Sequence, residues 1–120
     1  MHVKTFRDLI AWQKSMALAK MVYVATQEMP RSEIYGLTAQ MRRAAVSIPS
    51  NIAEGHGRQS RPDYLRFLRM ARGSLMELQT QLMIATDLGM LRPNSDLESI
   101  LEETDRVLQG LIRSLNNRGE

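Results

Sequence analysis

Apolar residues recur every three or four positions in four separate stretches of this chain, and this spacing constrains the fold more than any other feature. Such spacing places the apolar side chains along one face of an α-helix. We predict helices over about residues 8–28, 36–55, 61–88 and 95–115, joined by short turns. No stretch alternates as a strand would. The pattern predicts one all-α domain over residues 1–120, an antiparallel up-down-up-down four-helix bundle.

Each predicted helix has a face assigned to the core. The four faces are Leu9, Trp12, Met16, Ala19, Tyr23 and Thr26; Leu37, Met41, Ala44, Ile48 and Ile52; Leu68, Ala71, Leu75, Leu78, Leu82 and Ala85; and Leu97, Leu101, Thr104, Leu108, Leu111 and Leu115. The third face alternates spacings of three and four, which is typical of coiled-coil seams.

Helix ends are marked by residues that satisfy backbone groups. Ser60 with Pro62 predicts the start of the third helix, and Gly89 predicts its end. Ser95 and Glu98 have the spacing of a capping box at the start of the fourth helix.

Pro49 lies inside the second predicted helix. Because proline has no N–H and its ring crowds the carbonyl of Ala45, we predict that the helix bends or breaks there. Asn51 is placed to hydrogen-bond backbone freed at Pro49, and Gly55 to Gly57 predicts a flexible break. A row of small residues beside the core face would let a neighbouring helix approach closely: Ala44, Ser47, Asn51 and Gly55.

Two helices carry more apolar surface than a lone bundle needs. The second rows are Ile10, Ala17, Met21 and Val24 in the first helix and Leu65, Met76, Met83 and Met90 in the third. They are either scattered exposed residues, which soluble proteins tolerate, or a surface buried against another copy of the chain. We favour the second explanation and predict a homo-oligomer, whose subunit number the periodicity does not give.

Arginines cluster in the middle of the chain. The whole chain has sixteen Lys and Arg and thirteen Asp and Glu. Between residues 58 and 72, however, the only acidic residue is Asp63. Such a cluster can bind phosphate, or it can be a solvated helix face. The candidate nucleic-acid contacts are Arg42, Arg43, Arg58, Arg61, Arg66, Arg69 and Arg72.

Neither catalytic nor metal-binding chemistry is indicated. The chain has no cysteine and only two histidines, His2 and His56, and no metal, P-loop or nucleophile motif. We therefore expect a non-enzymatic protein without a metal or cofactor. With no apolar run that resembles a signal peptide or a membrane span, we expect a cytoplasmic location.

The segment SIPSNIAEG over residues 47–55, followed by Gly57 and Arg58, carries a family resemblance. With the opening residues 6–9 and 12–14, and Phe67-Leu68, Ala71, Gly73-Ser74, Glu77-Leu78, Gln81-Leu82 and Leu88-Gly89, the chain from Phe6 to Leu115 resembles the bacterial four-helix-bundle family of 23S rRNA intervening-sequence proteins.

The resemblance implies an all-α up-down bundle and a homopentamer with a central pore. It also implies a related fold in the accessory proteins of diversity-generating retroelements, which contact nucleic acid and a reverse transcriptase. The family offers no catalytic residues. Pro49, Asn51, Glu54, Gly55 and Arg58 carry over as matched positions, which we interpret as structural.

Two functions remain open. The first is an oligomeric protein that binds the phosphate backbone of RNA or DNA, because arginines repeated around an oligomer would build a large positive field. The second is a scaffold for another protein without nucleic-acid affinity, in which the arginines pair with acids of a neighbouring chain.

Overall fold

The computed structural model describes residues 3–117 of the chain, and the described part is all-α, as predicted. The long helices are α1 (Ile10–Ala25), α2 (Leu37–His56), α3 (Arg61–Asp87) and α4 (Ser95–Asn117). Three short 3₁₀ helices, η1 (Phe6–Asp8), η2 (Thr26–Glu28) and η3 (Arg31–Glu33), flank α1 and lead into α2.

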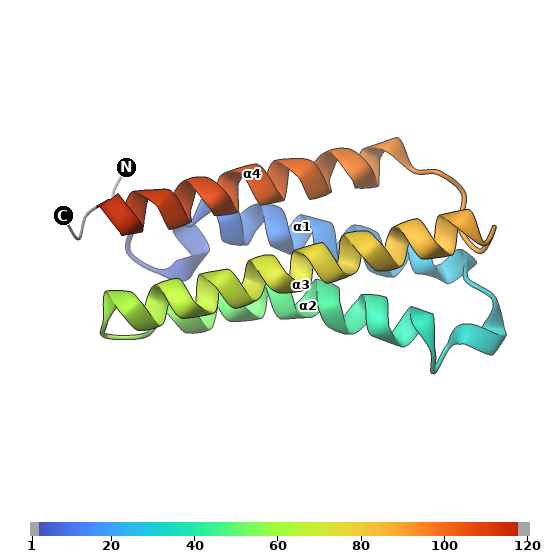
Figure 1. Cartoon of the computed structure of the whole chain (residues 1–120), viewed down its shortest axis with the longest axis horizontal. Coiled ribbons are helices and arrows are strands. Elements are labelled where there is room, and N and C mark those ends of the chain that lie inside the picture. The colour runs from blue at the N-terminus through green and yellow to red at the C-terminus, as the bar shows by residue number, and fades with distance from the viewer. Residues whose placement is uncertain (1–2, 118–120) are drawn as a thin grey trace.

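The four long helices form the predicted bundle (Figure 1). Each helix packs against the next along the chain, and α4 returns to pack against α1. Consecutive helices run in opposite directions (Figure 1). The α2–α3 connection therefore lies at one end of the bundle, and the α1–α2 and α3–α4 connections lie at the other. No helix within residues 3–117 is long and apolar enough to span a bilayer.

The start and end of α3 follow the predicted signals. The Ser60 hydroxyl accepts a hydrogen bond from the Asp63 N–H at 3.2 Å, and Pro62 occupies the first turn. At the other end Gly89 has a φ of +73°, a left-handed conformation that glycine adopts readily. The N–H of Met90 then donates to the carbonyl of Ala85 at 2.8 Å, which completes a Schellman motif.

The cap of α4 lies one residue earlier than predicted. The Asn94 side-chain oxygen accepts a hydrogen bond from the Leu97 N–H at 3.0 Å, so Asn94, and not Ser95, is the N-cap. Asparagine and serine are comparable caps, so residue type alone does not choose between them.

Replacing Asn94 with alanine should lower the free energy of unfolding by about 1 kcal/mol, the usual contribution of an N-cap side chain. Ser95→Ala is the matched control and should change that energy by less than about 0.5 kcal/mol. Urea denaturation of both variants at one protein concentration compares them. A larger loss of unfolding free energy in Ser95→Ala than in Asn94→Ala would show that Ser95, as predicted from the sequence, is the N-cap.

The buried face of the first helix agrees only in part with the predicted one, since Leu9, Ala19 and Thr26 are buried as predicted. The structure buries Ala11, Ser15, Leu18, Ala19, Val22 and Ala25, whereas Trp12 and Met16 are only partly buried and Tyr23 is 44% exposed. The α1 helix is thus rotated about its axis by roughly one residue from the prediction, about 100°. Helix α1 is also shorter than predicted, because extended Leu9 separates η1 from its start and Thr26–Glu28 form the 3₁₀ helix η2 at its end.

The faces predicted for α2, α3 and α4 are confirmed. Buried residues include Met41, Ala44, Ile48 and Ile52 of α2, Leu68, Ala71, Leu75, Leu78 and Ala85 of α3, and Leu97, Leu101, Thr104, Leu108 and Leu115 of α4. Leu37, Leu82 and Leu111 are partly buried against this core.

Helix α2 continues through Pro49, so the predicted break does not occur; the predicted bend remains a prediction. The Asn51 side-chain nitrogen donates to the Ser47 carbonyl at 2.9 Å, not to the carbonyl of Ala45 that proline leaves unpaired. The break predicted over Gly55 to Gly57 is confirmed in position, since α2 ends at His56 with Gly57 as its C-cap; its flexibility stays a prediction.

The small residues of α2 face α3, as predicted. The hydroxyls of Ser47 and Ser74 hydrogen-bond across the two helices at 2.7 Å. A Cβ atom at Gly55 would lie 2.8 Å from the Cβ atom of Phe67. Glycine at this position therefore sets how closely the two helices approach next to their connection.

Candidate nucleic-acid interface

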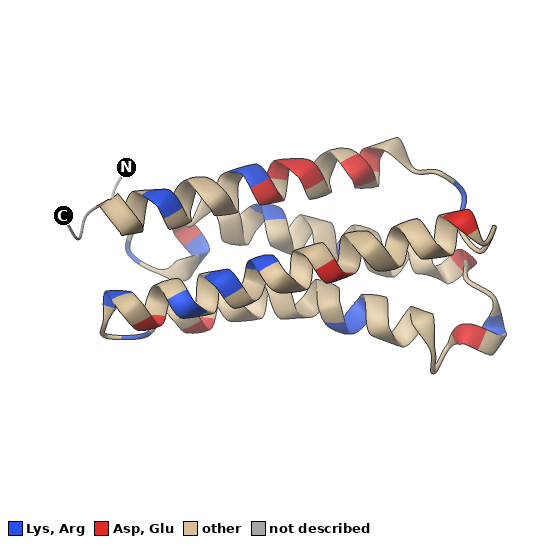
Figure 2. Cartoon of the chain, viewed as in Figure 1, with Lys and Arg blue, Asp and Glu red and all other residues tan. Residues whose placement is uncertain are grey.

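Five of the seven candidate arginines gather near the α2–α3 connection and along the N-terminal half of α3. Figure 2 shows these basic positions following one another along α3. Arg42 and Arg43 lie instead in the first half of α2, nearer the other end of the bundle.

Two of these arginines cover a buried phenylalanine. The Arg58 and Arg66 guanidinium carbons lie 4.7 and 4.6 Å from the centre of the Phe67 ring, which is 5% exposed. Each also contacts a nearby acid, Arg58 with Glu54 at 3.6 Å and Arg66 with Asp63 at 3.4 Å. The two arginine side chains remain about half exposed. Exposed pairs of this length add little stability, so both guanidinium groups stay accessible while the aromatic ring orients them.

The remaining arginine of this corner, Arg61, is exposed. It has no hydrogen-bond or ion-pair partner within residues 3–117, and the same is true of exposed Arg43 on α2. Neither guanidinium group is therefore bound by another side chain within residues 3–117.

Arg42 is held by the end of α1. Its Nε donates to the Thr26 hydroxyl at 2.9 Å and its Nη2 to the Tyr23 carbonyl at 3.4 Å. The guanidinium carbon also lies 4.8 Å from the centre of the Tyr23 ring. A cation at the C-terminal end of a helix complements the helix dipole, so Arg42 connects α1 to α2 and is the least available of the seven.

The next two arginines along α3 face α4. Arg72 Nε donates to the Asp105 carboxylate at 3.0 Å, and Arg69 Nη2 donates to the Asn116 side-chain oxygen at 3.2 Å. They line a groove of about 500 Å³ between α3 and α4, which Arg113 also lines. Arg113 was not predicted as a site residue, since the sequence does not reveal which residues of α4 line a groove with α3.

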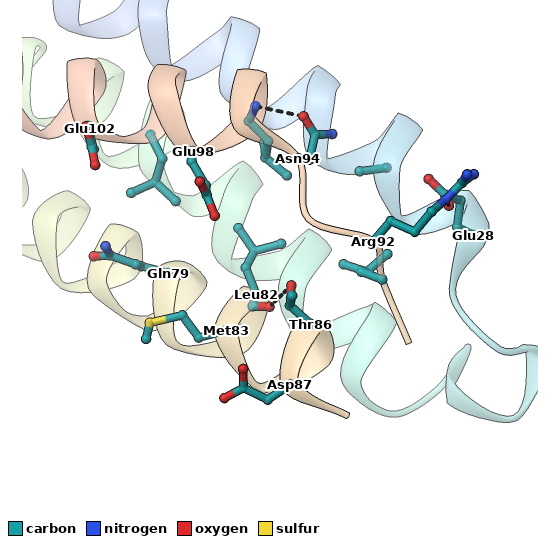
Figure 3. A pocket seen from close by; sticks show the side chains of 14 residues that line it. Glu28, Gln79, Leu82, Met83, Thr86, Asp87, Arg92, Asn94, Glu98 and Glu102 are labelled. Atoms are coloured by element: carbon teal, nitrogen blue, oxygen red, sulfur yellow. Dashed lines mark hydrogen bonds and ion pairs between the residues drawn. The ribbon is translucent and has the colours of Figure 1, made fainter. Parts of the chain in front are cut away.

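The same two helices form an acidic pocket farther along. Figure 3 shows Glu98 and Glu102 of α4 opposite Gln79 and Met83 of α3. This pocket has a volume of about 400 Å³, and Asp87 and the ion pair of Arg92 with Glu28 also line it. Figure 2 shows the acids gathered in the first half of α4. The face formed by α3 and α4 is therefore basic at one end and acidic at the other.

The second apolar row of α1 is largely exposed. Ile10 is 51% and Val24 66% exposed, Ala17 is exposed and Met21 is partly buried. These side chains are available to another molecule.

The second row of α3 is not one exposed stripe. Leu65 is only 8% exposed and belongs to the core, while Met76 and Met90 pack partly against it. Met83 alone of the four is well exposed, at 61%. Helix α3 packs against both α2 and α4. Part of this apolar row is therefore buried within the single chain.

An apolar groove of about 620 Å³ lies between α1 and α2. Its lining includes Trp12, Met16 and Tyr23 of α1 and Val46 and Pro49 of α2. Trp12, Met16 and Tyr23 were assigned to the core from the sequence. Because α1 is rotated relative to the prediction, they line this surface groove instead.

Other contacts of titratable groups join separate elements of the bundle, including a 3.0 Å ion pair between Arg92 and Glu28. The His56 ring lies edge-on to the Tyr64 ring, with 5.8 Å between ring centres, and burial raises the pKa of Tyr64. A 2.7 Å ion pair joins Lys14 to Glu103, and the hydrogen bond from Lys14 lowers the pKa of Glu103. Within residues 3–117 no three His, Cys, Asp or Glu side chains form a group that could hold a metal ion; His2 lies outside this range.

Comparison with known proteins identifies one family. A family model described as 23S rRNA-intervening sequence protein matches residues 7–113 of this chain. No curated protein matches it. The matched region includes all four long helices except the last residues of α4.

Proposed function

The chain belongs to the 23S rRNA-intervening sequence protein family, and we propose that it is a non-enzymatic, cytoplasmic homo-oligomer that binds the phosphate backbone of RNA or DNA. The contacts are arginines at the α2–α3 corner and along α3. A homopentamer is the assembly that the family resemblance implies.

The collection of arginines at one end of the bundle carries the proposal. Arg58 and Arg66 are oriented by Phe67 and remain accessible, and Arg61 is unpaired within residues 3–117. Phosphate contacts of this kind give affinity with little sequence readout. In an oligomer the same cluster is repeated in every subunit, and the repeats add to a strong field.

Oligomer formation draws support from the exposed apolar side chains. The α1 row and the groove between α1 and α2 leave several large apolar side chains at the surface of the single chain. Exposed apolar surface of this extent is typical of interaction sites.

Replacing both Arg66 and Arg69 with glutamate should weaken binding of an oligouridylate RNA at low salt by at least about tenfold, because phosphate contacts dominate such affinity. Fluorescence anisotropy with a labelled RNA measures this effect, and light scattering should give an unchanged particle mass.

The matched control is Arg31→Glu with Arg92→Glu, which changes the net charge equally at the opposite end of the bundle. The molecule is 48 Å long, several times the Debye length of about 10 Å at 0.1 M salt, so the control should change the affinity by less than about twofold. Equal losses in both double variants would show that only net charge matters and would remove Arg66 and Arg69 from the proposal.

The alternative function is an oligomeric protein-interaction scaffold with no nucleic-acid affinity. One observation favours it: the basic groove and the acidic pocket lie on the same face, so the arginines of one copy could meet the acids of another. If the wild-type protein retains neither RNA nor DNA at low salt, the scaffold is the better account.

A further inference from the structure

We propose that the groove between α3 and α4 binds the phosphodiester backbone of the nucleic acid through Arg69 and Arg113, with Arg72 farther along the groove, and that Gly73 leaves the room that the backbone needs. This inference rests on the proposed function and names the place on the surface where a backbone phosphate binds. It also adds Arg113 to the contact residues.

The register of α3 and α4 brings the three guanidinium groups to one groove. The hydrogen bond from Arg69 to Asn116 pairs these two positions across the antiparallel helices. Arg113 lies one turn from Asn116 on α4, whereas Arg72 donates to Asp105, farther along the same helix. Arg69, Arg72 and Arg113 all line the groove of about 500 Å³, at different positions along it.

The three arginines are only partly neutralised. Arg72 donates through Nε to Asp105 at 3.0 Å, and Gln109 holds the other carboxylate oxygen of Asp105 at 2.8 Å. Asn116 orients Arg69 without cancelling its charge, and Arg113 has no ion-pair partner within residues 3–117. A guanidinium has five N–H donors, so most donors of these three groups are available for the charge-assisted, bidentate bonds that phosphate accepts.

Gly73 is an independent observation that points to the same groove. Glycine inside a helix is less favourable than alanine, so packing usually explains its presence. At Gly55 packing does explain it, but a Cβ atom at Gly73 would have no atom within 4 Å among the described residues that limits it. Gly73 lines the groove and is exposed, which suits the close approach of an external group to the helix.

The acidic pocket limits where the phosphate can lie. Glu98 and Glu102 line the same α3–α4 face at its other end (Figures 2 and 3), where negative charge repels a nucleic-acid backbone. The basic groove is therefore the part of this face that a phosphate can occupy.

The first test compares Arg113→Gln with Arg106→Gln in the full chain. Arg106 is the matched control because it is exposed, lies seven residues earlier on the same face of α4 and does not line the groove. We expect Arg113→Gln to weaken oligouridylate binding about fivefold at low salt and to reduce the slope of log K against log salt by about one phosphate contact. Arg106→Gln should change affinity by less than about twofold. Equal effects of the two variants would overturn the assignment.

The second test fills the groove without touching a charge. Gly73→Leu places its side chain in open space, so the variant should fold, keep the wild-type particle mass by light scattering and lose affinity for oligouridylate about as much as Arg113→Gln. Inorganic phosphate at constant ionic strength should compete with the RNA in the wild type, and less in Gly73→Leu. Unchanged RNA affinity, or loss of the oligomer, would overturn the inference, the latter because Gly73 would then face another copy.

Failure of this inference is distinguishable from failure of the proposed function. If the wild-type protein binds RNA while Arg113→Gln and Gly73→Leu bind it as tightly as the wild type, only the groove is excluded. If the wild-type protein binds no nucleic acid at low salt, both proposals fail.

Discussion

Gly55→Ala is expected to lower the free energy of unfolding by about 2 kcal/mol. Alanine should favour the helix by up to about 1 kcal/mol relative to glycine. However, the new Cβ atom would lie 2.8 Å from the Cβ atom of Phe67 and 3.2 Å from the carbonyl oxygen of Tyr64. Both atoms are fixed to the α3 backbone, so α3 must move away, and overpacking of this kind costs about 1–3 kcal/mol.

The matched control is Gly73→Ala, the same substitution in an exposed helix interior. No limiting atom of the described chain lies within 4 Å of its Cβ position, so the variant should be more stable than wild type by about 0.5–1 kcal/mol. Urea denaturation at one protein concentration measures both. Stabilisation by Gly55→Ala would show that the helices separate easily and that glycine does not set their distance.

Leu65→Ala is expected to lower the free energy of unfolding by about 3 kcal/mol, because removing a buried leucine leaves a cavity. The sequence placed Leu65 in a row buried between subunits, whereas the structure buries it within the single chain. The loss should therefore be the same at every protein concentration.

Met83→Ala is the comparison from the same predicted row, since Met83 is 61% exposed. It should change the stability of the chain by less than about 0.5 kcal/mol, and a shift of the assembly to higher protein concentration would identify it as an interface residue. If the effect of Leu65→Ala disappears on dilution while that of Met83→Ala persists, the roles of the two residues are reversed.

The sequence was most reliable where the contrast between faces is strong. In α4 the leucines repeat opposite charged residues, and the predicted face is the buried one. In α1 apolar residues surround the helix almost completely, so periodicity could not choose a face. The structure buries Ser15 there, because its hydroxyl donates to the Trp12 carbonyl at 2.8 Å and needs no partner from another helix.

Some features of the candidate site could likewise be predicted from the sequence, and others depend on how the helices pack. The arginines of the α2–α3 corner are close in sequence, so their clustering was predictable. Their partners were not: the Phe67 ring beneath Arg58 and Arg66, and the Thr26 hydroxyl that holds Arg42, depend on how the helices pack.

By itself, the sequence determined the four helices, most of their ends, their order in the bundle and the arginine-rich segment, because local hydrogen bonding and periodic burial act within one helix. Tertiary structure alone decided which face of α1 is buried, that Leu65 belongs to the core and that Arg113 lines one groove with Arg69 and Arg72. Those features depend on the rotation and register of one helix against another, and they are set by the shapes of side chains that are far apart in the chain.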